Sequence, residues 1–112
     1  MTNSRQKGKR GELEFSAALR EFGFEARRGQ QFCGGEDSPD VVTSLTDVSF
    51  EVKRVEALNV DKAMDQAITD AKELIPVVAH RRNRKPWLIT VRLEDLKRFA
   101  SHVEKVSDEP KL

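Results

Sequence analysis

The chain has 112 residues, of which 38% are hydrophobic and 35% charged, a length and composition that fit one small domain. No stretch approaches the roughly 18 consecutive apolar residues of a membrane-spanning helix, and the first residues lack the apolar core of a signal peptide. The single cysteine, Cys33, excludes an internal disulfide and a metal site built from several thiolates. We therefore expect a cytoplasmic protein with no membrane partner.

The net charge of +1 hides a very uneven distribution of basic residues. The first ten residues hold four basic and no acidic side chains, and residues 81–85 hold four more basic ones. Clustered positive charge is typical of proteins that bind nucleic-acid phosphates, although basic loops are also common as plain solvated surface. Two basic pairs, Arg27 with Arg28 and Lys53 with Arg54, add to these clusters. The candidate phosphate-binding residues are Arg5, Lys7, Lys9, Arg10, Arg27, Arg28, Arg54, Arg81, Arg82, Arg84 and Lys85.

The spacing of apolar residues predicts secondary-structure elements in the order α-β-β-β-α-β-β-α. This order indicates an α/β (α+β) fold with a mixed β-sheet flanked by helices. The expected elements are a mobile basic arm over 1–7, helix 8–22, strand 24–32, a loop over 34–39, strands 40–43 and 48–55, helix 61–74, strands 76–79 and 87–93, helix 94–103, and a tail over 104–112. One domain is thus expected over residues 8–103.

A four-residue turn is expected to join the two strands within residues 40–55 into a hairpin. One side of that hairpin would be apolar and would face the core. The other side would carry Asp40 opposite Glu51, and Lys53, two residues further on, would point the same way.

Three further expectations concern the ends and faces of the helices. Gly23 is placed to end the first long helix, and Asp61 is placed to cap the N-terminus of the second. Leu96 and Phe99 are expected to face inward from the last helix.

Polar side chains occupy positions where a buried pattern would be apolar. Glu12 precedes Phe15 by three residues and Leu19 by seven, so it shares the helix face that these residues bury. Buried carboxylates are costly unless they are paired or bound to a cation. Together with the hairpin residues, Glu12 would form an oxygen-rich site that suits Mg²⁺ or Mn²⁺ rather than zinc.

Pro39-Asp40, followed after ten residues by Glu51-Val52-Lys53, resembles the signature of the PD-(D/E)XK nuclease superfamily. Glu12 resembles the first acidic motif of that superfamily, and the order of elements after it is similar, so the resemblance covers roughly residues 8–100. The small size and the basic segment before the acidic loop look most like archaeal-type Holliday junction resolvases, and phages and viruses carry similar short nucleases. The resemblance implies a restriction-endonuclease-like core.

The resemblance also implies an activity, namely Mg²⁺-dependent hydrolysis of DNA phosphodiester bonds, with Mn²⁺ able to substitute. Asp40, Glu51 and the Val52 carbonyl would hold the metal, and Glu12 would complete the site directly or through water. Lys53 would orient the attacking water or stabilise charge that develops on the phosphate.

DNA contacts and an assembly follow from the same resemblance. Arg27 or Arg28 would contact the scissile phosphate, and Ser38 and Gln66 would assist in binding DNA. The expected partners are branched DNA and a second copy of the chain, because two symmetric cuts in a four-way junction require two identical sites.

Each of these residues also has an ordinary interpretation. Glu12 suits the first turn of a helix, Asp40 suits a turn, and Glu51 with Lys53 suits a solvent-facing strand pair. Their joint placement favours the nuclease. The alternatives are a repair, flap or restriction-like nuclease of the same superfamily, a non-catalytic DNA-binding domain on the same fold, and a small scaffold protein.

Overall fold

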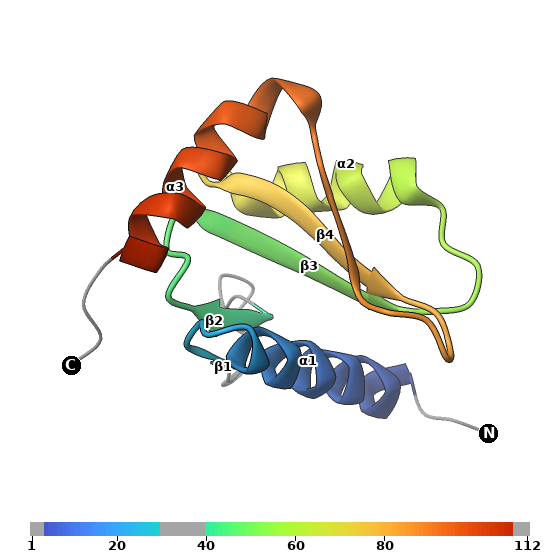
Figure 1. Cartoon of the computed structure of the whole chain (residues 1–112). Helices are drawn as coiled ribbons and strands as arrows, with labels where there is room; N and C mark the ends of the chain where they lie inside the picture. Colours follow the sequence, from blue (N-terminus) through green and yellow to red (C-terminus); the bar gives the residue numbers. More distant parts are fainter. Residues whose placement is uncertain (1–3, 30–39, 109–112) are drawn as a thin grey trace.

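The order of helices and strands agrees with the order predicted from the sequence, and the chain forms an α+β domain (Figure 1). The computed structural model describes residues 4–29 and 40–108. The elements are α1 (Ser4–Glu21), β1 (Ala26–Arg28), β2 (Val41–Thr43), β3 (Val48–Arg54), α2 (Val60–Ala71), β4 (Ile75–Arg81), β5 (Leu88–Val91), the short 3₁₀ helix η1 (Leu93–Asp95) and α3 (Leu96–Asp108).

The described strands form two sheets, so the predicted pairing of β2 with β3 is wrong. β1 pairs with β2 in antiparallel orientation, whereas β3 pairs in parallel with β4, which pairs in antiparallel orientation with β5. After β2 the chain does not turn back to form a hairpin with β3. The Ser44 N–H donates to the carbonyl of Glu25, the residue before β1, at 2.9 Å, and Leu45 is buried in the core with 3% exposure. β3 therefore takes β4 as its partner through the α2 crossover.

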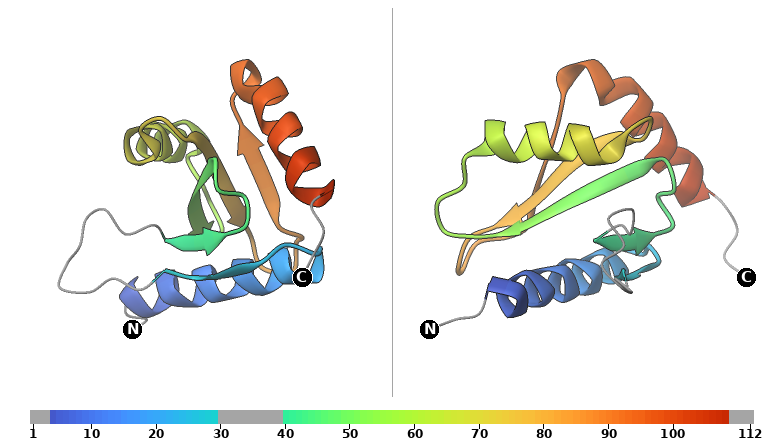
Figure 2. Two further views of the ribbon diagram at one scale, coloured as in Figure 1. Left: turned by 90° about the vertical axis from the view of Figure 1, so that its left-hand side faces the viewer. Right: turned by 180° about the vertical axis from the view of Figure 1, so that it is seen from behind.

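The two faces of the larger sheet are covered by different helices (Figure 2). Phe15 of α1 packs on one face, with its ring centroid 5.0 Å from that of Phe50 and 5.1 Å from that of Trp87. The opposite face is covered by α2, whose Ala63 and Ala67 pack on Val78. Because side chains alternate along a strand, this packing fixes which β3 residues point toward α2.

Several helix ends differ from expectation. α1 begins at Ser4, inside the expected arm, and α3 continues to Asp108, inside the expected tail, because Val106 still packs against the core. The N-cap of α2 is Asn59 rather than Asp61, since the Asn59 side chain accepts the Lys62 N–H at 3.0 Å.

Gly23 has a φ of 95° just after α1, as expected for the glycine that ends this helix. Leu96 is 49% exposed rather than inward-facing, whereas Phe99 packs partly against the core. Across the described ranges, no helix combines the length and the apolar character needed to cross a membrane.

Candidate active site

The centre of the candidate site lies on β3, where Glu51 and Lys53 point to the same side of the strand. Glu51 lies beside Val78 in register, on the face that α2 covers, and is only 7% exposed. The Lys53 Nζ lies 3.3 Å from the Glu51 Oε1. Burial and the nearby charge of Asp40 raise the pKa of Glu51, although the Lys53 ammonium opposes this shift. In the Glu51–Lys53 pair, Glu51 is therefore buried and Lys53 is partly exposed.

Asp40 lies immediately before β2 and reaches the backbone of β3. Its carboxylate accepts a hydrogen bond from the Val52 N–H. Burial and the charge of Asp70 raise the pKa of Asp40, while Lys53 and Arg28 lower it. In a strand the N–H and the C=O of one residue point to the same edge, so the Val52 carbonyl lies on the edge that Asp40 approaches.

Glu12 reaches the same cluster from α1. The Arg28 Nε donates to the Glu12 Oε2 at 3.2 Å, and the two side chains are 29% and 14% exposed, respectively. Burial and the charge of Asp40 raise the pKa of Glu12, and Arg28 opposes this shift. Arg28 also acts on Asp40, whereas Arg27 is exposed, so of the two arginines Arg28 belongs to this cluster.

Helix α2, which covers the face of β3 that carries Glu51 and Lys53, adds two side chains to the site. The Gln66 Oε1 accepts a long hydrogen bond, 3.5 Å, from the Lys53 Nζ. Asp70 follows Gln66 by four residues, one helical turn, and its charge raises the pKa of both Asp40 and Glu51. Gln66 was predicted from the sequence and Asp70 was missed, although the four-residue spacing from Gln66 is a signal that would have found it.

The donor chemistry fits a hard divalent cation. Asp40 and Glu51 are partly desolvated carboxylates, the charge of Asp40 raises the pKa of Glu51, and a bound cation would remove this cost of ionisation. Over residues 4–29 and 40–108, no three His, Cys, Asp or Glu side chains are grouped as a metal site. Mg²⁺ often takes only one or two protein carboxylates and completes its shell with water and substrate phosphates, so two carboxylates and one carbonyl suit it.

The predicted phosphate-binding residues are divided among several places. Arg54 and Arg81 contact Glu14, and the residues after β4 form a turn that we call the basic turn (residues 82–85). Lys9, Arg10 and Arg27 are exposed on α1 and β1. The side chains of Arg5 and Lys7, together with Cys33 and Ser38, lie outside the described part of the chain.

Comparison with protein-family models, with curated proteins and with solved structures found no match for this chain.

The raised pKa values of Glu12, Asp40 and Glu51 predict a pH-dependent stability. A folded state with raised carboxyl pKa values binds more protons than the unfolded chain, so these groups favour folding most below their ordinary pKa of about 4. Their contribution is lost as the pH rises through the raised values. Without divalent cations, we therefore expect the thermal midpoint to fall between pH 4.5 and 7.5 more steeply in the wild type than in a variant with all three residues changed to amides. Parallel pH profiles would contradict this.

Proposed function

We propose that this chain is a metal-dependent DNA endonuclease of the PD-(D/E)XK type, with a restriction-endonuclease-like core. The observation that carries the proposal is that Asp40, just before β2, lies close enough to act electrostatically on both Glu12 of α1 and Glu51 of β3, and that Glu51 pairs with Lys53 at 3.3 Å. Acids that are buried or half-buried, have raised pKa values and act on one another are costly for stability alone and are typical of functional sites.

The residues divide into a metal-holding and a phosphate-facing group. Asp40, Glu51 and the Val52 carbonyl would hold Mg²⁺ or Mn²⁺, which when bound supplies Lewis-acid activation of water and neutralises phosphate charge. Lys53, held between Glu51 and Gln66, donates a hydrogen bond to the attacking water or to a phosphate oxygen. The ion pair with Arg28 orients the Glu12 carboxylate at the side of the site.

The proposed substrate is branched DNA, in particular a four-way junction, with a homodimer as the acting form. Two identical sites related by a two-fold axis would place paired, symmetric nicks in the two opposing strands. Arg28 is the residue we assign to the scissile phosphate, because its guanidinium is the one that acts on both Glu12 and Asp40.

The test is cleavage of a labelled four-way junction beside a matched linear duplex, in Mg²⁺ or in EDTA. We expect paired nicks that require Mg²⁺ and that disappear in Asp40→Asn. Asp61→Asn is the matched control, because it removes an exposed carboxylate at the start of α2 and is expected to cut like the wild type. Equal cleavage of both substrates would point to a repair, flap or restriction-like nuclease. DNA binding with no cleavage in Mg²⁺ or Mn²⁺ would favour a non-catalytic DNA-binding domain.

A further inference from the structure

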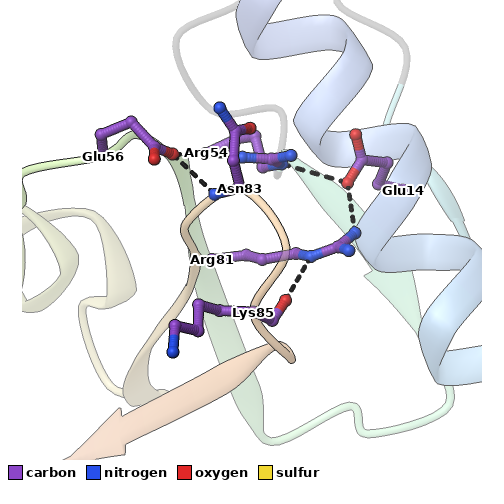
Figure 3. A network of polar contacts seen from close by, with 6 residues as sticks. All are labelled: Glu14, Arg54, Glu56, Arg81, Asn83 and Lys85. Carbon is purple, nitrogen blue, oxygen red and sulfur yellow. Dashed lines mark hydrogen bonds and ion pairs between the residues drawn. The ribbon is translucent and has the colours of Figure 1, made fainter.

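The basic turn is held in place by Glu56 directly and by Glu14 through Arg81, whose Nε donates to the Lys85 carbonyl at 2.6 Å (Figure 3). The Glu14 Oε1 accepts hydrogen bonds from Arg81 Nη1 at 3.0 Å and from Arg54 Nε at 3.2 Å, which ties the ends of β3 and β4 to α1. The Glu56 Oε2 accepts the backbone N–H of Asn83 at 2.6 Å, so the turn itself is bound to the segment after β3. The turn is thus anchored to two other parts of the fold.

The turn also carries backbone strain at its tip. The Lys85 N–H donates to the Arg82 carbonyl at 3.2 Å, which closes a four-residue turn, and Arg84 in its third position has a φ of 63°. Glycine or asparagine is preferred there, because other side chains pay a steric cost at positive φ. Asn83 stands one position too early to relieve it. The residue at this strained position is an arginine with an exposed side chain.

The contacts divide the basic residues into two groups. Arg54 and Arg81 are engaged by Glu14, so much of their charge is neutralised within the fold. The side chains of Arg82, Arg84 and Lys85 are exposed and make no ion pair with any residue of the described ranges. They are therefore free to bind an anion.

The turn follows β4 where Arg81 pairs in register with Arg54, the residue directly after Lys53. Figures 1 and 2 show this end of the sheet beside the N-terminal half of α1, which carries the exposed Lys9 and Arg10. The free cations of the turn thus lie at the end of β3 that carries the candidate site.

We propose that the basic turn is a preorganised clamp for the DNA phosphate backbone, and that Glu14 and Glu56 are positioning residues that strengthen DNA binding despite their negative charge. This inference rests on the proposed DNA partner. A turn that is already ordered loses little conformational entropy when it binds, and its cations meet successive phosphates without rearrangement. Arginine and lysine at the tip supply the charge, while the two glutamates supply the rigidity.

Removing an acidic side chain normally strengthens binding to DNA, whereas the proposal expects that removing Glu56 weakens it. Two charge-matched variants test this expectation. Glu56→Ala and Glu104→Ala each remove one exposed negative charge, but only Glu56→Ala also removes the acceptor of the Asn83 N–H, because Glu104, on α3, makes no side-chain hydrogen bond or ion pair with any described residue. Binding of a labelled four-way DNA junction is measured in EDTA by fluorescence anisotropy. We expect Glu56→Ala to bind about three- to tenfold more weakly than the wild type, the range expected when one ordered group loses its position. Glu104→Ala should bind equally or more tightly. Equal or tighter binding by Glu56→Ala would overturn the proposal.

Arg84→Gly gives an independent measurement, because glycine accepts the positive φ and so the variant removes the cation while keeping the turn. We expect an unchanged or higher thermal midpoint, weaker binding, and a plot of log Kd against log salt that is shallower by about 0.9, one phosphate contact. An unchanged salt slope would contradict the clamp. Binding is measured in EDTA and cleavage separately in Mg²⁺, so the two proposals can fail independently. A wild type that binds DNA in EDTA but does not cut it in Mg²⁺ refutes the nuclease, and the binding of the variants then decides whether the basic turn is a clamp. A wild type that does not bind DNA refutes both.

Discussion

Replacing Glu51 by glutamine is expected to slow the proposed DNA cleavage strongly and, at the same time, to stabilise the metal-free protein at neutral pH. Both effects follow from the position of the Glu51 carboxyl group, which is 7% exposed and close to Asp40. Because the pKa of Glu51 is raised, ionisation at neutral pH favours the unfolded chain, and a neutral amide of the same shape removes that penalty. The amide would also remove one of the ligands of the proposed metal ion. We expect a loss of about three orders of magnitude in cleavage rate, because a bound metal supplies several kcal/mol of transition-state stabilisation.

The stability gain is measured as the thermal midpoint in EDTA at pH 7.5 and again at pH 4.5. The gain should be larger at pH 7.5, since the wild-type carboxyl is increasingly protonated, and therefore neutral, at the lower pH. Lys53 loses its partner in the variant, but its side chain is 30% exposed and retains Gln66, so this loss is small. Added Mg²⁺ should raise the midpoint of the wild type and leave that of Glu51→Gln unchanged. A variant less stable than the wild type at pH 7.5 in EDTA would show that Glu51 is a structural residue.

Which candidate residues share one face of a helix or strand could be predicted better than how the strands pair, because a shared face is encoded locally. Glu51 and Lys53 are two residues apart on one strand, and Glu12 shares a helix face with Phe15, so periodicity alone places each of them. The choice of strand partner is different. β2 and β3 have equally β-prone sequences, and whether β3 pairs with its neighbour or with β4 depends on α2 and on the burial of Leu45, which no local pattern reveals.

The contacts of the acidic residues that hold the basic turn could not be predicted from the sequence either. Glu14 contacts Arg54 and Arg81, which follow it by 40 and 67 residues, and only the finished fold brings them together. From the sequence, all members of the basic cluster look alike as phosphate-binding candidates. The structure separates Arg54 and Arg81, which face Glu14, from the exposed Arg82, Arg84 and Lys85.

Replacing Gly11 by alanine is expected to destabilise the protein by about 1–3 kcal/mol, the usual cost of overpacking a close contact. Gly11 is buried where α1 crosses β3, and an added Cβ would lie 2.9 Å from the Arg54 Cβ. That atom is the base of the side chain and cannot swing away, so α1 has to move off the sheet. Because Glu12 is the next residue on α1, the same shift would displace its carboxylate from Asp40 and reduce cleavage as well.

Gly8→Ala is the matched control on the same helix. Gly8 is exposed, nothing lies within 4 Å of the position that an added Cβ would take, and alanine at such a site should stabilise the helix by about 1 kcal/mol. Urea unfolding of the two variants should therefore shift the midpoint in opposite directions, with the slope of the transition unchanged. The opposite signs matter, since helix propensity alone predicts that both substitutions stabilise. If Gly11→Ala were as stable as Gly8→Ala, α1 would not approach β3 this closely, and Glu12 would have no fixed position beside Asp40.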